Sequence, residues 1–464
     1  MRAASFWTSQ LAEEAARPAL PGPRGADVCI VGGGFTGLWT AYELKRAAPE
    51  LDVVVLEAEH VGFGASGRNG GWVLGELAGG RDTWVARGGR GGALALEQAI
   101  RATVDEVGAV VAREDIDCGW AKGGSLHVAR TPLELERLRA EHVADGAWRA
   151  QGSPASPPTE GRTLLSADEA AARVRVDGVR GALFSPHCAR VQPAALAHGL
   201  AAAAERAGVV VHERTRVSEI APGVARTALG DVRARVVVRA TEGYTAGLKG
   251  LERRLLPMGS SMIATEVLDD ATWTQLGWEQ AETILDGRRL YAYLQRSPDG
   301  RIAIGGRGVP YRFGSQTARE TPVEAATVAE LRERLVELFP ALRDVAVAGS
   351  WQGVLGVPRD WRPAVGLDRA SGLAWAGGYV GEGVAAANLA GRTLRDLVLE
   401  RETELTRLPW VGRFGRAWEP EPLRFAGVRI VHGLMEAADR RERSTGRASK
   451  LARAAELVSG RPAH

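Results

Sequence analysis

A glycine-rich turn between two apolar segments constrains the fold of this chain more than any other feature. Residues 27–31 (DVCIV) predict a short buried strand, and residues 32–37 (GGGFTG) lead directly into LWTAYELKRA, which has helical periodicity. A second buried strand, LDVVVLEA, reaches Glu57, twenty residues after Gly37. That spacing suits a carboxylate that accepts hydrogen bonds from a ribose diol. The order of strand, turn, helix, strand and acidic residue indicates a dinucleotide-binding unit; a glycine-rich turn without a ligand is the alternative.

The residues of this turn have different physical roles. Gly32 permits the tight turn, Gly34 lets a pyrophosphate approach the backbone, and Gly37 lets the helix pack close to the strand. The first helical residues, Phe35 and Thr36, present the helix start, whose N–H groups and positive dipole end favour an anion. We therefore expect these five residues to contact the phosphates of FAD or NAD, because both cofactors share this fingerprint.

Composition narrows the classes of function. The chain has 464 residues, and single cores stop growing at about 250–300 residues, so we expect two interleaved domains. A formal net charge of +3 without a long block of like charge argues against a nucleic-acid partner. The amino terminus predicts neither a signal peptide nor a membrane span, which favours a cytoplasmic enzyme. The scattered Cys29, Cys118 and Cys188 predict neither a disulfide framework nor a metal site.

Two further glycine-rich segments predict contacts with a large ligand. Residues 62–71 (GFGASGRNGG) are too rich in glycine for regular structure, and such a backbone can lie against a flat ring; a flexible surface loop is the alternative. Residues 377–383 (GGYVGEG) open the amphipathic helix VAAANLAGRTLRDLVLE, whose amino terminus favours negative charge on a reduced cofactor. The candidate cofactor-binding residues in these two segments are Ala65, Ser66, Arg68, Asn69, Gly70, Gly71, Gly378, Tyr379, Gly381 and Gly383.

Two more buried strands, residues 208–212 (GVVVH) and 236–241 (VVVRAT), complete a pattern that resembles a known family. The chain is similar to the D-amino-acid-oxidase-type FAD-dependent oxidoreductases, which include glycine oxidase and sarcosine oxidase. In GASGRNGG it is most similar to gamma-glutamylputrescine oxidase. The resemblance implies FAD, held noncovalently because no cysteine stands in the matching loops. It also implies a backbone contact from Val217 to the adenine, and places Ala240 and Thr241 near the pyrophosphate.

The same resemblance implies the domain organisation. We expect an α/β fold in which a Rossmann-like FAD-binding domain is interleaved with an α+β substrate domain. Residues 26–80, 180–250 and 355–400 are expected to form the discontinuous FAD-binding domain, and residues 81–179 and 251–354 the substrate domain. Residues 151–163 (QGSPASPPTEGRT) predict a surface loop. The C-terminal extension, 401–464, is expected to pack on a domain or on a partner subunit rather than to join catalysis.

The function implied is oxidation of the C–N bond of a small-molecule amine or amino acid to an imine, which hydrolyses to an aldehyde or keto product. Oxygen is the expected acceptor. Because the cofactor takes the hydride in such chemistry, the protein mainly positions the substrate and excludes water. The catalytic candidates are therefore residues expected to face the substrate.

Four residues are the catalytic candidates. Residues 290–308 (LYAYLQRSPDGRIAIGGRG) predict a hairpin that places Tyr291 and Tyr293 on one face; we expect one to line a pocket and the other to pack in the core, with Tyr293 the candidate. Arg307 follows the hairpin, near the position of an oxygen-activating lysine in sarcosine-oxidase-like enzymes.

The other two candidates come from residues 351–363, which begin with Trp351 and resemble the family's flavin-edge loop. Arg359 or Arg362 in this segment would suit a substrate carboxylate or phosphonate, because a guanidinium matches a planar anion; an ion pair within the loop is the alternative. Trp351 and Arg359 complete the catalytic set.

Other functions fit parts of the pattern. An amine dehydrogenase would pass electrons to an acceptor other than oxygen. An NADPH-dependent flavin monooxygenase shares the first glycine motif, but resembles sequences with a Gly-Asp pair at the late helix, where this chain has Gly378 and Tyr379. A cofactor-binding scaffold without catalysis is a third alternative.

Overall fold

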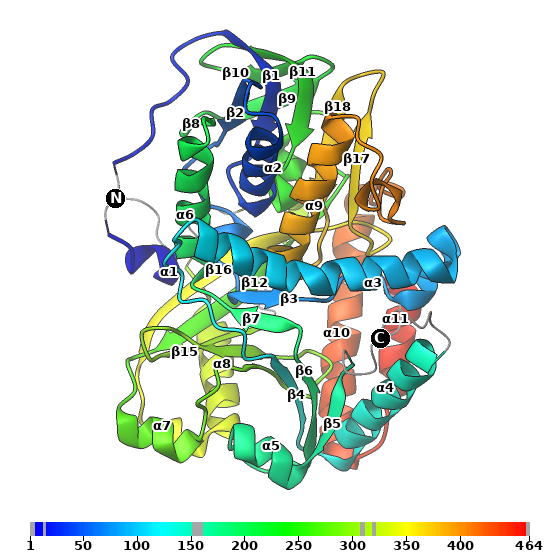
Figure 1. Cartoon of the computed structure of the whole chain (residues 1–464). Helices are drawn as coiled ribbons and strands as arrows, with labels where there is room; N and C mark the ends of the chain where they lie inside the picture. Colours follow the sequence, from blue (N-terminus) through cyan, green and yellow to red (C-terminus); the bar gives the residue numbers. More distant parts are fainter. Residues whose placement is uncertain (1–4, 13–14, 151–160, 307–310, 318–321, 461–464) are drawn as a thin grey trace.

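The glycine-rich turn joins a strand to a helix, as the sequence predicts. In the computed structural model, which describes residues 5–12, 15–150, 161–306, 311–317 and 322–460, β1 (Arg24–Val31) enters the turn and α2 (Phe35–Ala47) leaves it (Figure 1). β2 (Val53–Leu56) then pairs in parallel with β1. β1 lies inside a sheet of order β17-β18-β11-β1-β2-β8. The other strands are β8 (Val210–His212), β11 (Val232–Arg239), β17 (Ala364–Asp368) and β18 (Leu373–Gly377), with β9 (Val217–Ala221) and β10 (Val224–Thr227) joined to β11.

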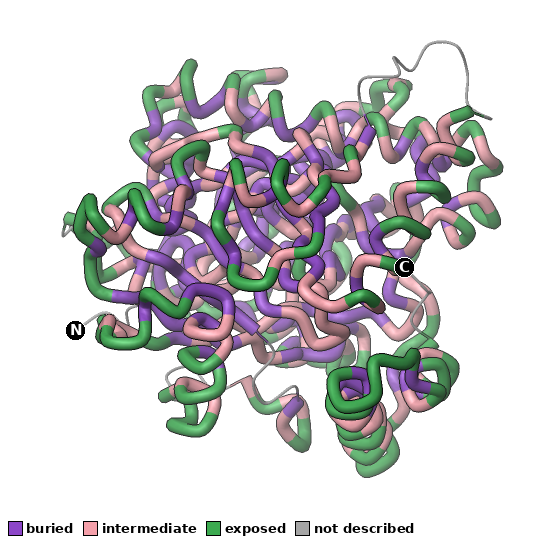
Figure 2. The backbone as a smooth tube through the Cα atoms, turned by 90° about the horizontal axis from the view of Figure 1, so that it is seen from below, coloured by how far each residue is buried: buried purple, intermediate pink, exposed green. Residues whose placement is uncertain are grey.

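Helices cover one face of this sheet, and the strands are apolar in consecutive positions, so both faces are buried. Val28 and Ile30 of β1 and Val238 of β11 are fully buried in one core with α2, α3 (Arg81–Arg113), α6 (Pro193–Arg206) and α9 (Gly383–Val398). Burying such a side chain is worth about 1.5–3 kcal/mol. In Figure 2 the buried stretches of the backbone lie mostly in the interior of the molecule, and exposed turns lie mostly at its periphery. None of the helices described has the length and apolar character needed to cross a bilayer.

A second sheet lies beside the first and has the order β16-β12-β15-β14-β13-β4-β6-β5. Its hairpin is confirmed, because β14 (Tyr293–Arg296) and β15 (Ile302–Gly306) pair antiparallel. The neighbouring β12 and β16 also pair antiparallel along ten positions. The other strands are β4 (Ser125–Ala129), β5 (Thr163–Ser166), β6 (Gly181–Ser185), β12 (Leu256–Thr265), β13 (Thr283–Leu285) and β16 (Val347–Val357). The helices on this side are α4 (Pro132–Ala150), α5 (Ala167–Arg173), α7 (Asp270–Leu276) and α8 (Ala325–Leu338).

The mixed α/β fold with a Rossmann-like unit is as the sequence predicts. The division into domains stays a prediction. The range 180–250 includes β6, whose partners β4 and β5 lie in the second sheet. Of the predicted surface loop at residues 151–163, positions 151–160 lie outside the described residues.

Short elements complete the chain. α1 (Phe6–Ser9) precedes β1, and β3 (Trp72–Leu74) pairs with β7 (Cys188–Arg190) in a two-stranded sheet. The carboxy-terminal α10 (Leu423–Thr445) and α11 (Lys450–Ser459) pack against each other and lie along the second sheet's side of the molecule (Figure 1).

Candidate active site

The turn after β1 is tightly packed, which explains its glycines. Gly32 has a φ of +114°, and a Cβ there would lie 2.5 Å from the carbonyl oxygen of Ala240. A Cβ on Gly37 would lie 2.0 Å from the Gly32 oxygen. Since real Cβ atoms do not approach backbone oxygens so closely, only glycine lets α2 start beside the carboxyl end of β1. Thr241 follows Ala240 at the end of β11, so the predicted pyrophosphate residues lie at one edge of the sheet.

Glu57 stands directly after β2 at the same edge. Its carboxylate accepts hydrogen bonds from the amide of Gly33 at 2.7 Å and from the amide of Glu59 at 2.9 Å. Burial nevertheless raises the pKa of Glu57 to about 7. Val217, the first residue of β9, is buried in one cluster with Leu56, the last residue of β2. The structure therefore brings together the residues predicted to bind the ribose and adenine.

The GASGRNGG loop is held by its own polar groups and is not a loose surface loop. The Asn69 side chain donates to the carbonyl oxygens of Ala65 at 3.0 Å and Ser66 at 2.7 Å, and accepts from the amide of Gly71 at 2.7 Å. Ser66 Oγ accepts a 2.8 Å hydrogen bond from the amide of Phe35 at the start of α2. This bond ties the loop to the glycine-rich turn.

A cavity of about 1280 Å³ opens between these loops and the second sheet. Many of the predicted cofactor residues line it, whereas the glycines of the first turn and the adenine-side residues do not. Those that line it are Phe35, Thr36, Ala65, Ser66, Arg68, Asn69, Gly70, Tyr379, Gly381 and Gly383. Thr36 Oγ1 and the Tyr379 hydroxyl lie 3.0 Å apart, so the starts of α2 and α9 meet at this cavity.

The second sheet contributes the opposite side of the cavity. Met258 and Ser260 of β12 and Tyr293 of β14 line it, and the Tyr293 hydroxyl lies 2.9 Å from Ser260 Oγ. Tyr291 lines the cavity as well, so both tyrosines reach it, and Tyr293 also packs against the buried cluster that contains Trp7 and Trp351. Ser260 was not predicted. It lies two residues after Met258, on the same face of β12, so the two-residue period of a strand is the signal that could have found it.

Glu242 is a functional candidate that the sequence analysis missed. It follows β11, lines the cavity, and accepts hydrogen bonds from the amides of Gly378 at 3.1 Å and Tyr379 at 3.1 Å. Burial raises the pKa of Glu242 to about 7, although these hydrogen bonds lower it. Its carboxylate fixes the turn that opens α9. A charged residue three positions after a buried parallel strand is the sequence signal that could have found it.

Two catalytic candidates do not line the cavity. Trp351 is buried against Trp7 and Phe6, and its indole N–H donates to the Arg68 carbonyl oxygen at 2.9 Å. Arg359 forms an ion pair with Glu419 at 3.1 Å and does not face a ligand site.

Arg362 pairs with Asp360 within its own loop. An ion pair within the loop, which was the alternative interpretation of the two arginines, is therefore what the structure shows for Arg362, whereas Arg359 pairs with Glu419 outside the loop. Arg307 lies outside the described residues.

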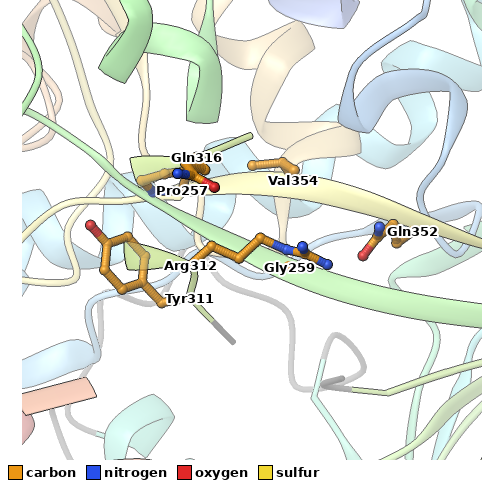
Figure 3. A pocket seen from close by; sticks show the side chains of 7 residues that line it. All are labelled: Pro257, Gly259, Tyr311, Arg312, Gln316, Gln352 and Val354. Carbon is orange, nitrogen blue, oxygen red and sulfur yellow. The ribbon is translucent and has the colours of Figure 1, made fainter. Parts of the chain in front are cut away.

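A small second pocket lies beside β12 and β16 (Figure 3). Figure 3 shows Arg312 extending along the sheet from Tyr311 toward Gln352. The volume of this small pocket, about 20 Å³, is close to the least that holds one water molecule, so the pocket is no substrate site.

Fold and cavity together define a class of proteins in which a dinucleotide-binding unit faces a second sheet across a ligand cavity. Residues 27–397 match the model of the DAO family of FAD-dependent oxidoreductases, and the chain belongs to that family. The protein is therefore an enzyme, and FAD is the cofactor that its family implies.

Individual relatives agree with this assignment. Gamma-glutamylputrescine oxidoreductase of Escherichia coli is 32% identical over 396 residues, which cover 82% of this chain and 86% of that protein. Glycine oxidase of Geobacillus kaustophilus is 26% identical over 390 residues, with 83% and 96% covered. The crystal structure of glycine oxidase from Geobacillus kaustophilus superposes with a TM-score of 0.69 at 24% identity, covering 85% of this chain and all of that one, and supports the fold.

Proposed function

We propose that the chain binds FAD noncovalently in this cavity and oxidises the C–N bond of a primary or secondary amine or amino acid. The imine so formed hydrolyses to an aldehyde or keto product, and oxygen takes the electrons. Relatives named for gamma-glutamylputrescine and for glycine support a substrate of this class. The observation that carries the proposal is a single cavity lined by the predicted cofactor loops on one side and by Tyr293 on the other.

The residues present fit FAD. The cavity is larger than the about 300–1,000 Å³ of ordinary small-molecule sites, which leaves room for a flat ring and a substrate together. The turn at Gly32 and the start of α2 would hold the pyrophosphate, and Glu57 the ribose. The loop from Ala65 to Gly70 and the start of α9 would hold the ring. No cysteine among the described residues lines the cavity, so a cysteinyl link to the flavin has no candidate among them.

FAD, when bound, supplies an acceptor for a hydride. The protein's own part is to hold the substrate and keep water out. Ser260 and Tyr293 offer hydroxyl groups from the second sheet, and Met258 offers apolar surface between them and the cofactor loops. The N-terminus of α9, fixed by Glu242, places backbone N–H groups and a positive dipole end at the cavity, which favours developing negative charge.

An amine dehydrogenase is the second candidate, and one observation favours it. No lysine is found among the described residues that line the cavity, so the cation that activates oxygen in sarcosine-oxidase-like enzymes has no lysine counterpart there. Arginines do line the cavity, Arg68 among them.

The purified protein is tested by its absorption spectrum and by anaerobic addition of a panel of amines and amino acids. Bleaching of an acid-extractable flavin by one of them, with peroxide formed on admitting air, is the expected result. Bleaching with reoxidation only by a dye or quinone selects the dehydrogenase. A flavin reduced by NADPH and by none of the amines contradicts amine oxidation and selects the monooxygenase.

A further inference from the structure

The loop between β16 and β17 contains a strained tryptophan at the cavity. Trp361 has a φ of +57°, is only 7% exposed, and lines the cavity. A positive φ is costly for a bulky residue, by about 1–3 kcal/mol, and persists only where the surroundings hold it. The structure must therefore contain contacts that hold Trp361 in this conformation.

Those contacts come from the end of the chain. The Trp361 indole N–H donates to the Ser459 carbonyl oxygen at 3.1 Å, and Arg359 Nη1 donates to the same oxygen at 2.9 Å. Arg359 Nε also bonds both carboxylate oxygens of Glu419 at 3.1 Å, and its guanidinium lies 5.1 Å from the Trp418 ring. The last residue of α11 thus fastens the loop that carries Trp361.

The hairpin of α10 and α11 is itself anchored on the second sheet's side. Asp439 accepts from the amides of Arg289 at 3.0 Å and Leu290 at 2.9 Å, and Glu442 pairs with Arg289 at 2.9 Å and Arg137 at 2.8 Å. Both carboxylates are buried, so these bonds are well shielded from water. The hairpin is a fixed part of the molecule, although it lies beyond the residues that match the family, 27–397.

The hairpin also lines the cavity. Met435 of α10, which belongs to a separate apolar cluster, and Glu456 of α11 line it. An apolar wall of the same cavity, which we define as Met258, Leu355, Val357, Trp361 and Val380, belongs to one cluster around Trp361. Another part of the same cavity is lined by charged side chains in ion pairs, among them Arg81 with Glu97 and Arg162 with Glu141. The cavity is therefore apolar at the wall around Trp361, the residue that the end of α11 holds.

We propose that the C-terminal hairpin holds Trp361 in place and that Trp361 and Met258 are specificity-determining residues, which select amines that carry an apolar substituent. This inference rests on the proposed function for its substrate class. Each methylene buried against the apolar wall raises affinity about fourfold, so affinity grows with the length of an unbranched chain.

The test uses the FAD-loaded enzyme and straight-chain primary amines from ethylamine to hexylamine under anaerobic conditions. Binding is read from the shift of the flavin spectrum, and reduction from its bleaching. In the wild type, affinity is expected to rise severalfold per added methylene. Trp361→Ala is expected to flatten this dependence, whereas Trp361→Phe, which keeps an aromatic ring but loses the indole N–H that bonds Ser459, is expected to retain only part of it.

Two further variants complete the design. Met258→Ala removes another part of the wall and is expected to flatten the dependence too, which keeps the test available if Trp361→Ala does not fold. Leu457→Ala is the matched control, because Leu457 is 79% exposed on α11. Affinity that is independent of chain length in the wild type, or unchanged in both wall variants, overturns the inference. Chain-length-dependent binding without bleaching supports the wall but contradicts amine oxidation.

Discussion

Replacement of Gly37 by alanine tests why the first turn is built from glycine. The added Cβ would lie 2.0 Å from the Gly32 carbonyl oxygen and 3.2 Å from Ile30 Cγ2. Neither the oxygen nor the helix start can turn away as a flexible side chain would, so α2 has to move from β1. The turn that is expected to hold the pyrophosphate moves with it.

The expected loss of unfolding free energy in Gly37→Ala follows from two opposing effects. Overpacking costs about 1–3 kcal/mol, and an overlap with backbone belongs at the upper end of that range. Alanine in a helix returns about 1 kcal/mol relative to glycine. A net loss of about 2 kcal/mol remains, and if FAD binding requires the undistorted turn, the dissociation constant of FAD rises about 30-fold.

The assay is fluorescence titration of the FAD-free protein with FAD, together with urea unfolding. Gly427→Ala in α10 is the matched control, because its Cβ meets nothing within 4 Å, so helix propensity alone predicts a gain of about 1 kcal/mol in unfolding free energy. A Gly37→Ala protein that binds FAD like the wild type and resists urea like the control refutes the reasoning.

Three more predictions follow from single contacts. Ser66→Ala removes the acceptor for the Phe35 amide and is expected to cost about 1 kcal/mol in unfolding free energy, read from urea denaturation. Tyr293→Phe loses the bond to Ser260 and is expected to lower kcat/KM for the amine with FAD affinity unchanged; equal losses of both would show a general structural defect. Because the pKa of Glu57 is raised to about 7, its ionised form, the better acceptor for ribose hydroxyls, is populated as pH rises through that value. FAD affinity should therefore increase between about pH 6 and 8 and do so much less in Glu57→Gln. In the FAD-free protein the same raised pKa makes the unfolding free energy fall as pH rises from the ordinary value of 4.5 to about 7 and level off above it, which thermal unfolding at a series of pH values measures.

Local patterns in the sequence predict the parts of the site that depend on neighbouring residues. The buried strand, glycine-rich turn and helix at residues 27–47 are confirmed because each follows from apolar spacing and glycine geometry within one segment. The hairpin of β14 and β15 is confirmed for the same reason, since alternation and a Pro-Asp-Gly turn define it locally.

Contacts between distant segments could not be predicted in this way. Arg359 looks like a substrate-binding arginine in its own loop, yet its partner Glu419 lies 60 residues further on. The C-terminal extension packs on the molecule as expected, but it also lines the cavity through Met435, which no local pattern indicates. Glu242 was passed over because its partners, the amides of Gly378 and Tyr379, lie more than 130 residues away.

In the proposed function, a substrate held between the cofactor loops and the second sheet loses a hydride from the carbon beside its nitrogen. The most direct measurement is anaerobic single turnover with an amine deuterated twice at that carbon, with flavin bleaching and the mass of the product recorded together. We expect the amine to lose one deuterium from that carbon for each flavin reduced. A product that keeps both deuterium atoms while the flavin bleaches, or an amine panel that leaves the bound flavin oxidised, would contradict it.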